Sequence, residues 1–128
     1  MRPKHLVVAN NTALIFSNQI QVYSQTQEQS LRIIKFPDGV SASLFSQPIV
    51  SKDEKTVGVV VERLESSGIF SKSERLVNRE LLIYETETWM LVNTVKLSTS
   101  GFVEATFDVD GTRLAVLQDH EVRFYDLK

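Results

Sequence analysis

The sequence contains no cysteine, and this absence excludes disulfide bonds, thiolate metal sites and cysteine nucleophiles. It also has no run of 18 apolar residues, and the short apolar run 6–9 that follows Pro3 and His5 lacks the length of a signal-peptide core. We therefore expect a soluble protein of the cytoplasm or nucleus, with no membrane partner.

An excess of charge of one sign is also lacking. Fourteen basic and 16 acidic residues give a formal net charge of −2, which excludes the broad positive field that drives nonspecific binding to nucleic acid. Any contact with RNA therefore requires a local basic patch.

Residues and motifs typical of catalytic sites are few. The two histidines, His5 and His120, lie far apart, and no metal-ligand spacing, phosphate-binding glycine loop or nucleophile elbow is present. His120 stands between Asp119 and Glu121, which fits either an acid–base or metal cluster or a solvated hairpin turn, and we favour the turn. We expect no enzymatic activity, cofactor, metal or small-molecule substrate.

The sequence does contain a succession of short β-type segments. Of its 128 residues 42% are hydrophobic, enough for the core of one domain. Apolar runs of four to nine residues alternate with turn-rich breaks and none sustains helical periodicity, so the chain is predicted to be all-β. Residues 56–61 (TVGVVV) are apolar almost without alternation, which predicts a strand covered on both faces. The expected strands are residues 6–9, 13–16, 19–23, 31–36, 43–45 leading into 49–50, 56–64, 80–84, 91–97, 103–107, 113–117 and 122–125.

Three tyrosines mark an internal repeat. Tyr23, Tyr84 and Tyr125 lie near the ends of the similar runs IQVYS, LLIYE and VRFYD. Tyr84 and Tyr125 are 41 residues apart, the period of a four-stranded propeller blade, whereas Tyr23 and Tyr84 are 61 apart. An insertion in the middle repeat accounts for most of this excess.

A small polar residue stands six positions before each of these tyrosines. These residues are Ser17, Asn78 and Asp119, and each side chain is able to hold a tight turn through hydrogen bonds to the backbone. We expect all three to lie in equivalent turns.

Residues 119–126 (DHEVRFYD) resemble the WD-repeat family of β-propellers, with Tyr125 in the place of tryptophan. The family's glycine–histidine pair is missing from all three repeats, and Ser24 and Glu85 replace the aspartate after the aromatic residue. The resemblance implies a partial propeller of about three four-stranded antiparallel blades, at approximately residues 5–36, 37–97 and 98–128. It also implies a scaffold for protein–protein interaction.

A weaker resemblance concerns the order of the repeats. A short first blade, a long insertion after a strand ending in Glu62 and Arg63, and a third blade ending in VRFYD are similar to the propellers of eukaryotic initiation factor 2A and of subunit b of eukaryotic initiation factor 3. This likeness implies a scaffold in translation initiation that contacts RNA or the ribosome.

Closure of such a propeller needs more than this chain supplies. Propellers usually have four to eight blades, whereas the sequence predicts about 11 strands, three blades lacking one. The resemblance implies that the missing outer strand belongs to the first blade, and that an apolar sheet face lies open at each end. The chain is then a fragment of a longer propeller, half of a six-bladed dimer, or a piece completed by another protein. We favour the first and third explanations without ranking them.

The insertion is the strongest candidate for a binding site. Residues 65–78 (ESSGIFSKSERLVN) replace turns of two or three residues in the other repeats. We expect this 14-residue loop either to anchor a protein partner, to stack on RNA bases, or to fold Phe70 back onto its own blade. The candidate contact residues are Ile69, Phe70, Lys72, Arg75 and Leu76.

Overall fold

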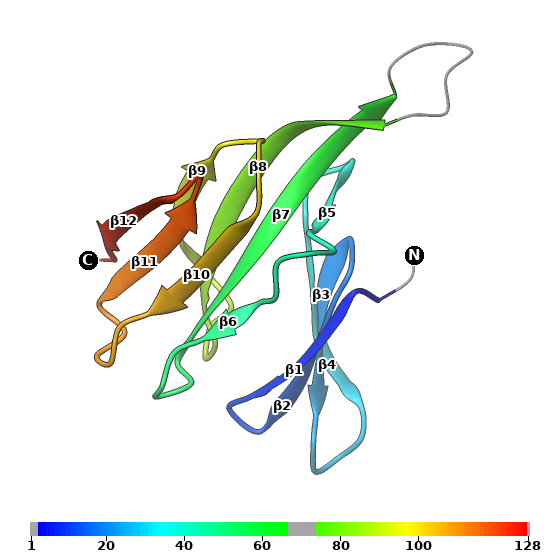
Figure 1. Cartoon of the computed structure of the whole chain (residues 1–128). Helices are drawn as coiled ribbons and strands as arrows, with labels where there is room; N and C mark the ends of the chain where they lie inside the picture. The colour runs from blue at the N-terminus through cyan, green and yellow to red at the C-terminus, as the bar shows by residue number, and fades with distance from the viewer. Residues whose placement is uncertain (1–2, 67–73, 128) are drawn as a thin grey trace.

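The computed structural model describes residues 3–66 and 74–127, which form twelve strands in three antiparallel sheets (Figure 1). The all-β fold expected from the sequence is confirmed. In chain order the strands are β1 (His5–Ala9), β2 (Thr12–Phe16), β3 (Gln19–Ser24), β4 (Ser30–Lys35), β5 (Val40–Ala42), β6 (Ile49–Val50), β7 (Thr56–Ser66), β8 (Glu74–Glu85), β9 (Leu91–Leu97), β10 (Val103–Phe107), β11 (Arg113–Gln118) and β12 (Glu121–Asp126).

Two hairpins turn at pairs of residues with left-handed backbone. Asn10 and Asn11 join β1 to β2 with φ values of 50° and 60°, and Asp119 and His120 join β11 to β12 with values of 53° and 67°. Positive φ at both central residues is the geometry of a type I′ turn, which Asn and Asp tolerate well. His120 therefore lies in a hairpin turn, as expected.

The second sheet has a broken inner strand. Its order is β5-β7-β8-β9, and β6 pairs with a second stretch of β7. The strand predicted at residues 43–45 is wrong, because the chain leaves the sheet after Ser43, whose N–H donates to the Val60 carbonyl oxygen at 2.8 Å, and returns at β6. Pro48 lacks a backbone N–H and restricts the residue before it, so an uninterrupted strand is disfavoured here.

The first sheet has four strands in the order β1-β2-β3-β4, whereas the third has three, β10-β11-β12. The expectation that the first blade lacks its outer strand is therefore wrong. Among the described residues, the sheet without a fourth strand is the third one.

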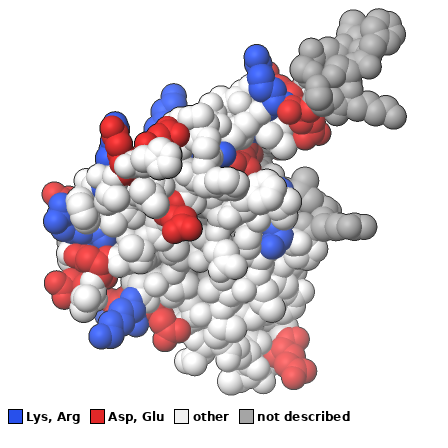
Figure 2. Space-filling model, in the orientation of Figure 1, with Lys and Arg blue, Asp and Glu red and all other residues white. Residues whose placement is uncertain are grey.

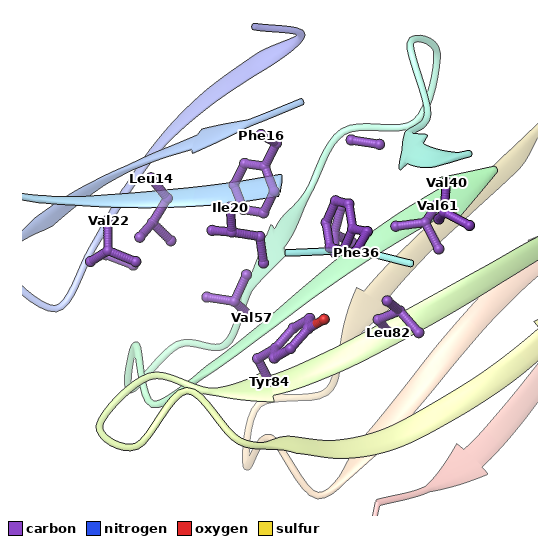
Figure 3. Packing of buried hydrophobic residues seen from close by; sticks show 13 residues of the cluster. Leu14, Phe16, Ile20, Val22, Phe36, Val40, Val57, Val61, Leu82 and Tyr84 are labelled. Atoms are coloured by element: carbon purple, nitrogen blue, oxygen red, sulfur yellow. The ribbon is translucent and has the colours of Figure 1, made fainter. Parts of the chain in front are cut away.

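The second sheet packs between the other two. Along β7, Val57, Val59 and Val61 join a core with the first sheet (Figure 3). On the other side of the strand, Val60 joins a core with the third sheet. The prediction that residues 56–61 are covered on both faces is thus confirmed. Gly58 leaves room for β6, because a Cβ at this position lies 2.9 Å from Ile49 Cγ1.

Candidate interaction surfaces

The three repeated tyrosines lie on the third strands of the three sheets, β3, β8 and β12. Tyr84 is buried against the first sheet and its ring centroid lies 6.2 Å from that of Trp89. Burial raises the pKa of the Tyr84 hydroxyl above its ordinary value. Tyr125 is half-buried against the core shared with the second sheet. Tyr23 is also half-buried, and its hydroxyl accepts a hydrogen bond of 3.0 Å from Gln21 Nε2.

The three polar residues expected in turns do not all lie in turns. Ser17 lies between β2 and β3, and Asp119 between β11 and β12. Asn78 instead lies within β8, opposite Arg63 of β7, so the turn predicted there is wrong. The insertion lengthens both strands of this hairpin, which moves the turn away from Asn78.

The prediction of a 14-residue loop at residues 65–78 is also wrong, because both strands of the hairpin are longer than expected. β7 continues to Ser66 and β8 begins at Glu74, so both ends of the segment 65–78 are paired strand. Arg75 lies opposite Glu65, and Leu76 opposite Leu64. Ile69, Phe70 and Lys72 lie outside the described residues.

The β7–β8 hairpin projects beyond the other strands (Figure 1). Near its end, acidic and basic side chains lie side by side, and both signs also occur along the left side of the view, whereas the lower right carries few charged side chains (Figure 2). Because Arg75 faces Glu65, the described part of the hairpin is not a purely cationic surface.

The first sheet turns one apolar face away from the core. Leu6 and Val8 of β1 are 69% and 60% exposed, and Ile33 of β4 is 47% exposed. The register places Leu6 beside Ile15, on the side opposite to the buried Leu14 and Phe16, because alternate residues point to opposite faces. We call this surface the leading face; its residues are Leu6, Val8, Ala13, Ile15, Tyr23 and Ile33, with the polar Gln21 between Ile15 and Ile33.

The third sheet has a corresponding open surface, the trailing face, formed by Ala115, Leu117, Val122 and Phe124. Val122 is 56% exposed and Phe124 is 60% exposed. The Arg113 guanidinium lies 4.9 Å from the Phe124 ring centroid and forms an ion pair of 3.1 Å with Asp126. A shallow hollow of about 200 Å³ lies on this face, lined by Ala115, Leu117 and Val122 and, on β10, by Ala105 and the polar residues Glu104 and Thr106.

A third apolar feature, a pair of exposed phenylalanines, was not predicted from the sequence. Phe45 and Phe102 are 76% and 80% exposed and form an edge-to-face pair with ring centroids 6.4 Å apart. Phe45 borders a cavity of about 370 Å³ that Ile49 and Val103 also line. The sequence signal for this pair was an aromatic residue in each of two polar, turn-rich segments. Phe45 lies shortly before Pro48, and Phe102 directly follows Gly101.

A nearly buried ion pair holds the segment that carries Phe102. Arg79 Nε donates to Glu62 Oε2 at 3.1 Å, and the two side chains are 11% and 16% exposed. Arg79 also donates to the carbonyl oxygen of Gly101 at 2.9 Å. This contact ties the connection between β9 and β10 to the middle of the second sheet.

Across residues 3–66 and 74–127, no group of three or more His, Cys, Asp or Glu residues is arranged to hold a metal ion. In the same residues no helix is long and apolar enough to cross a membrane.

Comparison with known proteins identifies the fold alone. No protein-family model matches the sequence, and no curated protein matches it. A solved structure of Kuenenia stuttgartiensis hydrazine synthase superimposes with a TM-score of 0.64 at 19% identity, over 89% of this chain and 31% of that chain. A Kluyveromyces lactis Hsv2 structure aligns over 98% of this chain and 49% of its own, at 15% identity and a TM-score of 0.38, a score from which no common fold is inferred.

The chain thus spans about a third of the hydrazine synthase chain that it matches. An identity this low supports a common fold and no common activity. Taken together with the three packed antiparallel sheets, this match shows that the chain has an all-β, partial β-propeller-like fold.

Proposed function

We propose that this chain is a non-catalytic scaffold that binds other proteins as part of a larger propeller or a multi-subunit assembly. The observation that carries the proposal is the pair of apolar open faces, the leading face and the trailing face. Contiguous apolar patches on a protein surface mark interaction sites, because covering them removes apolar area from water.

The two internal junctions show how such faces pack. Where the first and second sheets meet, Leu14, Ile20 and Val59 are no more than 1% exposed. The open faces carry side chains of the same kind with roughly half of their surface exposed. A partner that presents another apolar sheet would complete the packing that the internal junctions already have.

The proposal also includes the family: a WD-repeat-like propeller. The run VRFYD of residues 122–126 supports a WD-repeat-like propeller, with protein partners or further blades as neighbours and the cytoplasm or nucleus as its location. The alternative, an RNA- or ribosome-associated scaffold that binds through residues 65–78, is less well supported because Arg75 lies opposite Glu65. RNA binding is therefore treated as an outcome of the test.

The test is capture of partners from cell extract on the tagged chain, with and without nuclease. We expect Val8→Asp and Val122→Asp each to remove captured proteins, because a carboxylate on an apolar face must be desolvated on binding. Val109→Asp is the matched control, since Val109 is 75% exposed in the β10–β11 turn, outside the strands that form the two faces. Circular dichroism establishes that each variant remains folded.

Two results would contradict the proposal. If all three valine variants capture the same proteins as the unchanged chain, the faces are not the binding surfaces. If capture instead disappears on nuclease treatment and in a combined Lys72→Ala, Arg75→Ala variant, with a steep dependence on salt, the ligand is RNA.

A further inference from the structure

We propose that the exposed pair of Phe45 and Phe102 is the docking site for an extended segment of a partner protein that carries a lysine or arginine beside an apolar residue. The inference rests on the proposed function and names the chemistry of one protein partner. Three observations support it: the anchoring of the two rings, the hollow that borders each ring, and the carboxylates that lie beside them.

The two rings are exposed, but the segments that carry them are anchored. Phe45 and Phe102 are 76% and 80% exposed, and their ring planes meet at 83°. Ser46 Oγ donates to the Val103 carbonyl oxygen at 3.2 Å, which ties the segment of Phe45 to β10. Arg79 holds the carbonyl oxygen directly before Phe102. A site whose segments are already ordered loses less conformational entropy when a partner binds.

The cavity of about 370 Å³ beside Phe45 reaches the apolar core. Its lining includes Val60, Leu81 and Val103, which are 3%, 1% and 4% exposed and belong to the core between the second and third sheets. This volume lies within the range of ligand pockets. An apolar side chain of a partner would therefore find both room and an apolar floor here.

A second hollow, of about 360 Å³, borders Phe102 and is lined by Gly101, Leu117, Asp119 and His120 as well. Gly101 has a φ of 71°, and a Cβ at this position lies 2.9 Å from Asp119 Oδ1, so glycine lets the carboxylate approach the segment of Phe102. The hollow thus combines a ring, an aliphatic side chain and a carboxylate. Lysine and arginine match this combination, because their stems pack on apolar surface while their charged ends reach a polar partner.

A second carboxylate lies near the same ring. Phe102 and Glu104 flank the buried Val103, so the alternation of side chains places both on the side opposite to Val103. Glu104 also lines the cavity beside Phe45. An aromatic ring attracts a cation over its face, and a neighbouring carboxylate adds a Coulombic attraction.

Neither carboxylate is neutralised by a cation in the described part of the chain. There, Glu104 and Asp119 form no ion pair, and no lysine or arginine lines either of the two hollows. Asp119 also lines a separate hollow with Lys96 and Arg123, but Arg123 has its own carboxylate, Glu121, at 3.4 Å. The charge beside the rings is therefore complementary to a cation brought by a partner.

The placement of the two hollows selects an extended protein segment. One hollow borders each ring, so a chain that crosses the pair can place an apolar side chain beside Phe45 and a basic one beside Phe102. The two carboxylates repel the phosphates of RNA and the side chains of an acidic segment. A basic and apolar segment is the occupant that satisfies both hollows.

The first test is a selection of random peptides displayed on phage. The full chain is the bait, and the double variant Phe45→Ala, Phe102→Ala is used for counter-selection. We expect the selected peptides to share a lysine or arginine next to an apolar residue. Selection of acidic or purely apolar peptides, or of none that distinguish the two baits, overturns the proposal. Thermal melting of the double variant should match that of the unchanged chain, because both rings lie largely in water.

The second test is calorimetric titration of a synthetic peptide with the selected sequence. Phe45→Ala and Phe102→Ala should each raise the Kd by roughly tenfold or more, as for anchor residues at interfaces. Phe124→Ala is the matched control, since Phe124 is 60% exposed but lines neither hollow, and it should leave the Kd unchanged. Equal losses in all three variants overturn the site.

The third test concerns the charges. Asp119→Asn and Glu104→Gln should each raise the Kd by roughly two- to fivefold, the size expected for an exposed ion pair. Asparagine tolerates the φ of 53° at position 119, so the turn is kept. Both effects should vanish with a peptide in which glutamine replaces the basic residue. Losses that persist with the glutamine peptide overturn the contact with a cation.

These results also separate the docking site from the proposed function. If no peptide depends on the phenylalanine pair while Val8→Asp still removes captured proteins, the docking site is wrong and the proposed function stands. If the peptide binds as expected while Val8→Asp and Val122→Asp remove no captured protein, the open faces are not binding surfaces and the docking site stands.

Discussion

Tyr84 and Tyr125 occupy equivalent positions in the repeat, yet they differ in burial. Tyr84 is 5% exposed between two sheets and contacts Trp89, whereas Tyr125 is half-buried on a strand with a free edge in the described structure. At the scale of single residues, the same side chain therefore contributes differently to the free energy of unfolding in the two sheets.

Replacing Tyr84 with Ala should lower the free energy of unfolding by about 3–5 kcal/mol, the range for removing a large buried ring. Tyr125→Ala should cost less, because part of the ring is already in water. Chemical denaturation measures both, and Tyr84→Phe is the control for the hydroxyl. An equal loss at the two positions would show that packing at Tyr125 is as complete as at Tyr84.

Burial of Tyr84 also predicts a loss of stability in alkali. Its pKa is raised above the ordinary 10.0, so the folded protein keeps the phenol proton at a pH where the unfolded chain releases it. The unfolded state then binds fewer protons, and stability falls as pH rises above 10. Denaturation midpoints at about pH 8 and about pH 11 should differ less in Tyr84→Phe than in the unchanged chain; equal differences would contradict the assignment.

At the scale of elements, the β7–β8 hairpin is the part that departs most from a regular blade. Its strands pair as far as Ser66 and Glu74, and a shift of register falls between Arg63 and Leu64. The pairing beyond Arg63 adds length to the arm and is distant from both apolar cores, so its removal should affect binding more than folding.

Replacing residues 67–73 with Asn-Gly should leave the fold intact. Ser66 and Glu74 are already paired, and Asn-Gly is the preferred two-residue hairpin turn. Shortening this connection from seven residues to two changes the free energy of loop closure by only about 1 kcal/mol, in the stabilising direction. Thermal melting is the measurement, and a large drop in the midpoint would show that the replaced residues pack against the domain.

A second feature at the scale of elements is the ion pair between Glu62 of β7 and Arg79 of β8. Arg79→Met should cost about 2–3 kcal/mol, somewhat less than for a fully buried pair, because it leaves a nearly buried carboxylate without its partner. The double variant Arg79→Met, Glu62→Gln should recover part of this loss. If the double variant is no more stable than the single one, the lost contact of Arg79 with Gly101, and not the unpaired charge, accounts for the effect.

At the scale of the whole molecule, the second sheet couples two cores. Val59 and Val60 are neighbours on β7, but Val59 belongs to the core with the first sheet and Val60 to the core with the third. The described chain is therefore a stack in which the middle sheet takes part in every apolar junction.

Val59→Ala and Val60→Ala should each destabilise the chain by roughly 2 kcal/mol, the lower part of the range for truncating a buried aliphatic side chain to alanine. Because both cores share β7, each variant should unfold in a single transition. Intrinsic fluorescence of Trp89, which packs against the first core, and far-ultraviolet circular dichroism should coincide. Separate transitions in Val60→Ala would show that the third sheet melts independently.

The sequence by itself determined most of the strands and their repetition. Alternating β-branched runs, the turn pair Asn10 and Asn11, and the spacing of Tyr84 and Tyr125 are local signals, and local backbone preferences are enough to read them. The strand at residues 56–61 was also readable, because a strand covered on both faces has no need of polar alternation.

Only the tertiary structure decided how these strands are placed. The pairing of Arg75 with Glu65 and the departure of residues 44–48 from the inner strand depend on partners distant in sequence. The same holds for the two faces: Ile20 and Val122 are equivalent apolar residues, yet one is buried and the other is 56% exposed. The physical reason is that burial depends on which sheet packs next to a residue, and the local sequence pattern does not indicate whether a sheet packs there.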